Sequence, residues 1–256
     1  MDISREYPLL EFDADRQAML EPHARAKVEN VPTHAVACFF QDVISTLIEQ
    51  HDAKLLCEWD MEMGKHSVYE ITFQDQRLAV FQPGMGAPLA AGNLEEMIGL
   101  GIRACIACGG AGVLDNSINV GEVVVPYAAV RDEGTSYHYL PPAREVEANS
   151  EVLAIIKNVL QAHEVPHLLT KTWTTDALYR ETRAKIQQRK AEGCQVVEME
   201  AASFFAVTQF RGIKFGQLLY GGDDVGSDEW SNRKWRTHTI RERLFWLAAE
   251  ACLQVP

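Results

Sequence analysis

The sequence predicts an α/β fold in which a mostly parallel sheet is covered by helices on both faces. Two observations predict it. Strand-like and helix-like segments alternate along the chain, and several strand-like segments are continuous apolar runs, as in a sheet buried on both sides. The chain has 256 residues, of which 47% are hydrophobic and 23% charged. This composition is typical of a globular protein with a full core, and we expect one domain over residues 1–256.

The first clear element is an antiparallel hairpin, formed by β-rich residues 68–73 and 77–81 around a polar turn. A segment rich in glycine and proline, 82–88, follows it. Apolar residues then recur at helical spacing over 94–101, before a buried strand at 102–107. The later predicted elements are strand 120–130, helix 152–160, strand 168–173, helix 201–210, strand 213–220 and helix 240–253.

Charge and targeting signals narrow the class of protein. The chain carries 24 Lys and Arg against 36 Asp and Glu, a net charge of −12, which argues against nucleic acid or an anionic membrane as main partner. There is no basic, apolar leader and no run of ~20 apolar residues, so we expect a cytoplasmic protein without a membrane span.

The cysteines give no sign of a disulfide framework or a metal site. Six cysteines in so long a chain are expected to be reduced thiols. Cys105 and Cys108 form a C-x-x-C pattern, but they lie in or at the end of an apolar strand and no second pair exists. We therefore expect neither redox chemistry nor a bound metal.

Glycines follow the strand at 102–107. Gly109, Gly110 and Gly112 stand where α/β proteins place ligand loops, because backbone without side chains can approach a ligand closely. They do not form the G-x-G-x-x-G of dinucleotide-binding folds. The alternative is a tight turn with no function.

Two acidic pairs stand at the boundaries of predicted elements, one before a helix and one after a strand. Glu198 and Glu200 precede an apolar helix, where negative charge suits the helix dipole; a carboxylate there can also accept both hydroxyls of a ribose cis-diol. Asp223 and Asp224 follow strand 213–220, either as a polar turn or as a proton donor whose pKa its neighbour raises. We expect Trp230, Trp235 and Trp246 to pack or to cover a cleft.

In order, these motifs resemble the nucleoside phosphorylase family, which includes uridine phosphorylase, hexameric purine nucleoside phosphorylase and the methylthioadenosine nucleosidases. The resemblance covers most of the chain. Its parts are F-D-A-D-R at 12–16, G-M-G-A-P at 84–88, the glycines at 109–112, I-N-V-G-E-V-V at 118–124, V-R-D-E-G-T-S-Y-H at 130–138 and V-E-M-E-A-A at 197–202. The I-N-V-G-E-V-V and V-E-M-E-A-A pair is the most specific.

The resemblance implies a central mixed sheet, curled into a partial barrel and flanked by helices. It implies a homo-oligomer, a dimer or a ring of dimers, whose active sites are shared between subunits. The candidate for the shared residue is Lys65 or His66. The implied partners are a nucleoside and inorganic phosphate as co-substrate, with no cofactor.

Residue by residue, the resemblance assigns Glu200 to the ribose hydroxyls and Met199 to the sugar. Asp223 or Asp224 would contact N7 of the leaving base. The other implied nucleoside contacts are Glu198, Leu178 and Gly112, and the implied phosphate ligands are Arg16, Gly84, Gly109 and Gly110.

The chain departs from the family at two subsites. The Gln and Arg that read uracil fall on Thr182 and Ala184, although Arg180 and Arg183 are close, so a purine base is favoured. At the phosphate subsite, Phe12 replaces the first glycine of G-D-P-x-R. Ala107 and Gly110 replace an arginine and a Ser or Thr.

The expected reaction is cleavage of a nucleoside's N-glycosidic bond by phosphate, giving free base and (deoxy)ribose 1-phosphate. Two alternatives remain open. One is hydrolysis by a nucleosidase, and the other is a nucleoside-binding protein without catalysis, whose phosphate site has decayed.

Overall fold

The computed structural model describes residues 3–22, 28–235 and 240–256, and in these residues all strands belong to one mixed sheet. The helices and strands, in chain order, are β1 (His34–Cys38), α1 (Gln41–Gln50), β2 (Lys54–Met61), β3 (Gly64–Phe73), β4 (Gln76–Phe81), α2 (Ala87–Leu100), β5 (Ala104–Val113), β6 (Val123–Asp132), β7 (Glu145–Glu147), α3 (Ser150–Ala162), β8 (His167–Thr175), α4 (Arg183–Ala191), β9 (Cys194–Glu198), α5 (Ala201–Arg211), β10 (Lys214–Asp224) and α6 (Ile240–Leu253).

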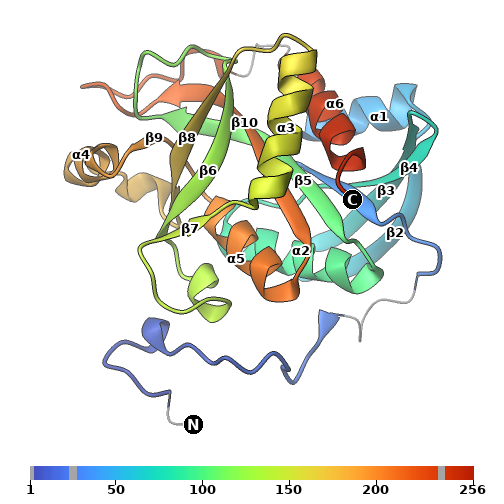
Figure 1. Ribbon diagram of the computed structural model, residues 1–256, viewed down its shortest axis with the longest axis horizontal. Coiled ribbons are helices and arrows are strands. Elements are labelled where there is room, and N and C mark those ends of the chain that lie inside the picture. The colour runs from blue at the N-terminus through green and yellow to red at the C-terminus, as the bar shows by residue number, and fades with distance from the viewer. Residues whose placement is uncertain (1–2, 23–27, 236–239) are drawn as a thin grey trace.

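Part of the sheet closes on itself. β5, β9, β8, β6 and β10 pair in that order, and β10 pairs back onto β5. The remaining strands β1, β4, β3 and β2 extend the sheet outward from β5, and β7 pairs with β6 (Figure 1). Parallel and antiparallel pairs alternate irregularly around this ring. The expected mixed sheet, curled into a partial barrel, is confirmed.

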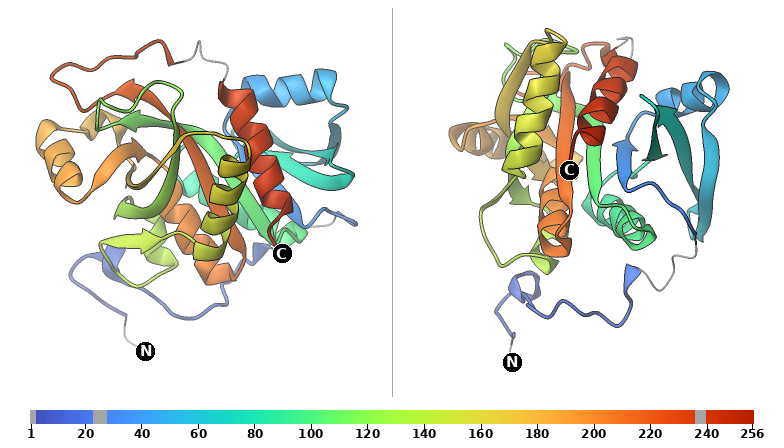
Figure 2. Two further views of the ribbon diagram at one scale, coloured as in Figure 1. Left: turned by 45° about the horizontal axis from the view of Figure 1, so that its top comes forward. Right: turned by 45° about the vertical axis from the view of Figure 1, so that its right-hand side comes forward.

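Helices cover both faces, as predicted. α1, α3 and α6 pack on one face, and α2 and α5 pack on the other. Figure 1 shows α3 and α6 next to each other, and both views of Figure 2 show the same pair.

Alternation along β5 explains the two layers. Ile106 and Cys108 join the core beneath α6, whereas Cys105 and Ala107 join the core beneath α2 and α5. Because successive side chains of a strand point to opposite faces, an apolar run is what a strand between two helical layers requires.

The structure confirms the predicted hairpin as β3 and β4. Its turn residues Gln74 and Asp75 have positive φ values of 50° and 59°, the conformation of a tight two-residue hairpin turn. The predicted helix at 94–101 is also present, but α2 starts earlier, at Ala87. Pro88 opens its first turn, where its missing N–H costs nothing.

One expectation needs correction. The glycines at 109–112 are expected in a loop or tight turn, but β5 continues through them to Val113, with Gly109 and Gly110 paired with β10 and Gly112 paired with β9. Glycine is found within a strand where a side chain from a neighbouring element packs directly against the backbone.

Several elements carried too little signal to be predicted. They are β1, α1, β2, β7, α4 and β9. Among the described residues no helix has the length and apolarity needed to span a bilayer. All six cysteines are free thiols, and burial raises the pKa of Cys105 and of Cys108.

Candidate active site

A cavity of about 910 Å³ opens where β5 and β10 run parallel toward their carboxyl ends. This is the edge at which open α/β sheets bind ligands. Four turns complete its wall: the β1–α1 turn, the turn before α2, the β9–α5 turn and the loop after β10. We call it the central cavity; its lining includes Phe39, Phe40, Met85, Gly109, Gly110, Gly112, Leu178, Glu181, Arg183, Val197, Glu198, Met199, Glu200, Gln217, Tyr220, Asp223, Trp230, Trp235 and Arg241.

The glycines of β5 leave room in this cavity for side chains from other elements. A Cβ added at Gly109 would lie 3.0 Å from the Phe39 ring, and one at Gly110 would lie 3.2 Å from the Tyr220 ring. At Gly112 the added Cβ would lie 3.1 Å from Val197 and 3.5 Å from Oδ1 of Asp223. These glycines therefore shape the cavity wall without forming a loop.

Glu198 is held by hydrogen bonds inside the fold. Its carboxylate accepts the hydroxyl of Thr174 at 2.6 Å and the backbone N–H groups of Glu200 and Ala201 at 2.7 and 2.6 Å. The last two are amides at the start of α5, so Glu198 caps that helix. Burial raises its pKa, and these bonds oppose the rise. Its geometry is that of a positioning residue for the β9–α5 turn.

Glu200 is the N-cap residue of α5 and is also buried. Its Oε1 accepts the backbone N–H of Gly86 at 2.6 Å, which ties the α5 turn to the turn before α2. Burial, and then the charge of Glu198, raise the pKa of Glu200 to about 8. A buried carboxyl group facing a cavity, with few protein donors, is suited to accept hydroxyls from a ligand. Met199 lines the cavity between these two glutamates.

The two aspartates after strand 213–220 have different surroundings. Asp223 lines the cavity, and its Oδ2 accepts the indole N–H of Trp230 at 2.8 Å. Asp224 is turned into its own loop, where it accepts the N–H groups of Gly226 and Ser227 at 2.9 and 3.0 Å. The geometry favours Asp223 as the ligand contact and gives Asp224 a structural role.

The tryptophans of the C-terminal segment behave as predicted. Trp230 and Trp235 line the cavity, although Trp230 is 65% exposed. Trp246 packs on the ring of Phe73, with ring centroids 5.0 Å apart.

The segment before α4 brings two further charged groups to the cavity. Glu181 and Arg183 line it together with Leu178, while Thr182 between them caps α4. Burial, and then the charge of Asp223, raise the pKa of Glu181 to about 7. The sequence analysis assigned the base-reading positions to Thr182 and Ala184, each one residue further along the chain, and so did not name Glu181.

Only two of the four expected phosphate ligands line the central cavity. Gly109 and Gly110 line the cavity, but Arg16 and Gly84 do not. Arg16 stacks on the ring of Phe210, 5.0 Å from its centroid, at the end of α5 opposite Glu200. Gly84 has φ +81° and shapes the turn that presents Met85.

Two cations line the central cavity among the described residues, Arg183 and Arg241. Arg241, in the first turn of α6, donates to both carboxylate oxygens of Asp42, at 3.0 and 3.1 Å, and to the Tyr220 hydroxyl at 3.3 Å. It also stacks between Phe40 and Trp235. Arg241 could not be singled out from local sequence, because the contact joins α6 to α1 across 199 residues.

Gln217 occupies the place next to Ala107, the position at which the family resemblance expects an arginine. The two residues pair in register between β10 and β5. Gln217 is buried, lines the cavity, and has no hydrogen-bond partner for its Oε1 among the described residues. A neutral amide thus stands beside the position where a cation was expected.

The candidates for a residue shared between subunits lie on the β2–β3 hairpin. Lys65 pairs with Glu58, and the ring of His66 stacks on Trp59 with centroids 4.7 Å apart. Neither lines the central cavity of its own chain.

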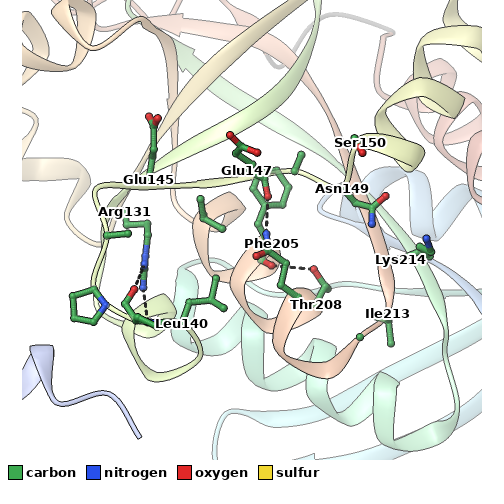
Figure 3. A pocket seen from close by; sticks show the side chains of 17 residues that line it. Arg131, Leu140, Glu145, Glu147, Asn149, Ser150, Phe205, Thr208, Ile213 and Lys214 are labelled. Carbon is green, nitrogen blue, oxygen red and sulfur yellow. Dashed lines mark hydrogen bonds between the residues drawn. The ribbon is translucent and has the colours of Figure 1, made fainter. Parts of the chain in front are cut away.

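A second cavity, of about 800 Å³, lies between β7 and α5 (Figure 3). Several of its polar groups are already used within the fold. Arg131 donates to the carbonyl oxygens of Leu140 and Pro141, and Gln209 donates to the carbonyl of Glu147. We assign no ligand to it.

Comparison with known proteins finds related sequences and related structures. Residues 33–251 match the family model of the phosphorylase superfamily, a range that starts after the F-D-A-D-R segment and Arg16. The chain is 27% identical over 187 residues to guanosine phosphorylase of Halorubrum lacusprofundi, which is 68% of this chain and 76% of that protein. It is 26% identical over 157 residues to uridine phosphorylase of Haemophilus influenzae, covering 56% of this chain and 62% of the relative, less than two thirds of its length.

Solved structures share the fold. Purine nucleoside phosphorylase of Toxoplasma gondii superposes with a TM-score of 0.77 at 21% identity, over 92% of this chain and 96% of that one. AMP nucleosidase of Bacteroides thetaiotaomicron superposes with a TM-score of 0.69 at 20% identity, over 88% and 89%. The chain therefore belongs to the phosphorylase superfamily and has the fold of its nucleoside-cleaving enzymes.

Proposed function

We propose that this protein cleaves the N-glycosidic bond of a purine nucleoside by phosphorolysis, giving free base and (deoxy)ribose 1-phosphate. The observation that carries the proposal is that Glu200 and Asp223, from distant parts of the chain, line one cavity. In the proposed reaction Glu200 accepts the ribose hydroxyls and Asp223 hydrogen-bonds the leaving base.

The chemistry requires three groups. The C1′–N9 bond breaks with its electron pair moving to the base, so a proton donor at N7 makes the base a better leaving group. Asp223 supplies this contact. Glu200 holds the sugar hydroxyls as positive charge develops at C1′, and a phosphate oxygen forms the new bond to C1′.

The phosphate subsite is proposed at the end of the cavity formed by Gly109, Gly110 and Arg241. Extended backbone without side chains lets an anion approach, and Arg241 provides a cation. The names of the curated relatives, which are phosphorylases of guanosine and of uridine, support this acceptor.

Hydrolysis is the second candidate, and one observation favours it. The charge of Arg241 is already paired with Asp42, and the neutral Ala107, with Gln217 beside it, stands where a cation was expected. The carboxyl groups of Glu181, Glu200 and Asp223 line the same cavity, and a dianion is more costly to hold there than a water molecule.

We also propose a cytoplasmic role in purine salvage, as one domain that assembles into a dimer or a ring of dimers. Lys65 or His66 of the exposed β2–β3 hairpin is the proposed contribution to a neighbouring site. Light scattering at micromolar concentration checks the assembly, and a monomer would contradict it.

The test of the reaction is a panel of nucleosides incubated with and without phosphate. We expect base release from purine nucleosides that requires phosphate and yields ribose 1-phosphate. Release of free ribose without phosphate would establish the hydrolase instead, and tight binding with no release would contradict both reactions. Glu200→Gln should lower kcat/KM by about 100-fold or more, whereas Glu49→Gln, an exposed residue on α1, should not change it.

A further inference from the structure

Gln217 carries a buried amide that the fold itself does not use. The residue is 2% exposed, and what remains open of it lines the central cavity. Its Oε1 has no hydrogen-bond partner in the part of the chain that the structure describes. A buried acceptor without a donor costs free energy that a ligand can recover by supplying the missing proton.

The register of β10 and β5 places this amide beside the proposed phosphate subsite. Gln217 pairs with Ala107, and two residues further along Leu219 pairs with Gly109. Because alternate residues of a strand share a face, Gln217 lies on the same face of the sheet as Leu219 and Gly109. A Cβ added at Gly109 would lie 3.6 Å from the Leu219 side chain, which agrees with this register. An anion that approaches Gly109 from this face therefore comes close to Gln217.

An amide selects anions differently from a cationic side chain. A guanidinium only donates hydrogen bonds, whereas an amide has an acceptor oxygen as well as two N–H donors. At neutral pH, monohydrogen phosphate carries one P–OH group and can satisfy both. Sulfate has the same tetrahedral shape and the same double charge but no proton, so it leaves a buried acceptor unpaired and facing its own oxygens.

We propose that Gln217 selects the anionic co-substrate by its proton: Oε1 accepts the P–OH of monohydrogen phosphate, and Nε2 donates to a second phosphate oxygen. This inference rests on the proposed function and adds a specificity residue to its phosphate subsite. Protonated tetrahedral oxyanions, phosphate and arsenate, are accepted, and sulfate is discriminated against.

The experiment measures initial rates of base release from a purine nucleoside at varied phosphate, at varied arsenate, and at varied phosphate with sulfate as competitor. The variant is Gln217→Met, which keeps the length of the side chain and removes its polar group. The control is Gln50→Met, at an exposed position at the end of α1.

In the natural protein we expect KM values for phosphate and arsenate within about threefold of each other. The inhibition constant of sulfate should be about 10- to 100-fold higher, the effect of one buried acceptor left unpaired. Gln217→Met should raise the KM of phosphate and of arsenate about tenfold and change the sulfate constant by less than about threefold, so that the preference is lost. Gln50→Met should keep it.

A second measurement separates this role from a structural one. Because Oε1 is unpaired in the free protein, Gln217→Met should not lower the free energy of unfolding measured in urea without phosphate. A loss of stability would mean that the amide is already paired within the fold, contrary to the proposal.

Failure of the proposal and failure of the reaction are distinguishable. If base release requires phosphate but sulfate competes as strongly as phosphate, or if Gln217→Met keeps the phosphate KM, the role of Gln217 is wrong and the reaction stands. If release does not require phosphate, or no nucleoside is cleaved, the proposed phosphorolysis fails. Calorimetry with inorganic phosphate and with sulfate then tests the amide alone: a preference for phosphate that Gln217→Met abolishes would support the contact, and equal affinities or no phosphate binding would overturn it.

Discussion

The backbone N–H of Gly86 donates to Oε1 of Glu200 over 2.6 Å, joining two turns that are 114 residues apart in the chain. Gly86 is the N-cap residue of α2 and Glu200 is the N-cap residue of α5. Because α2 and α5 pack together on one face of the sheet, this bond fixes the cavity wall at the point where two helices begin.

Glu200 makes the unliganded protein less stable at alkaline pH. Its pKa is about 8 in the folded state, against 4.5 for the ordinary group. Between these values the folded protein binds more protons than the unfolded chain, so stability falls as pH rises from ~4.5 and the full cost is present above pH ~8. Glu200→Gln should therefore gain roughly 4 kcal/mol relative to the natural protein on going from pH 5 to pH 9. Urea unfolding at both pH values measures this, and a pH-independent difference would contradict it.

Substitution of Asp224 should mainly lower the free energy of unfolding, whereas substitution of Asp223 should mainly lower kcat. Asp224→Ala leaves the N–H groups of Gly226 and Ser227 without their acceptor and should cost about 1–3 kcal/mol. Asp223→Asn should keep the stability within ~0.5 kcal/mol, since its partner Trp230 is exposed, but should lower kcat by about 100-fold. Denaturant titration and initial rates on one nucleoside measure both. The reverse pattern would show that the roles are exchanged.

Alanine substitutions at Gly226 and Gly92 should change the free energy of unfolding in opposite directions. A Cβ at Gly226 would overlap the carbonyl oxygen of Leu114, which is backbone and cannot turn away, so Gly226→Ala should cost more than ~2 kcal/mol or displace the loop after β10. Gly92 lies on the exposed side of α2 with nothing near its Cβ position, so Gly92→Ala should gain about 0.5–1 kcal/mol. Urea unfolding of both variants checks the pair. A loss of stability in Gly92→Ala would be inconsistent with the packing of α2.

Arg241 and Arg16 should differ in their effect on phosphate. Arg241→Gln should raise the phosphate KM at least tenfold, because it removes a cation from the cavity. Arg16→Ala should leave the phosphate KM unchanged, since Arg16 lies on Phe210 outside the cavity. Steady-state kinetics at varied phosphate gives both values. If the phosphate KM rises for Arg16→Ala and not for Arg241→Gln, the anion is bound by Arg16, as the F-D-A-D-R motif predicts.

The elements that could be predicted from the sequence are those whose signal is local. The hairpin of β3 and β4 follows from β-rich runs around a polar turn, and α6 has the predicted bounds because its apolar residues repeat at helical spacing. V-E-M-E-A-A places two glutamates where β9 ends and α5 begins, and G-G-D-D places two aspartates at the end of β10. Four of the carboxyl groups near the candidate site, those of Glu198, Glu200, Asp223 and Asp224, could therefore be named from the sequence.

Which of these groups line the same cavity could not be predicted, because it depends on contacts between residues far apart in the chain. Asp223 faces the cavity and Asp224 its own loop, a difference set by the Gly226 and Ser227 amides. Glu181 reaches the cavity from the segment before α4, which the sequence did not mark as an element. Arg241 lies there because α6 packs beside α1, and Arg16 does not because its segment lies against Phe210. Local patterns specify elements, whereas packing brings particular side chains together in one cavity.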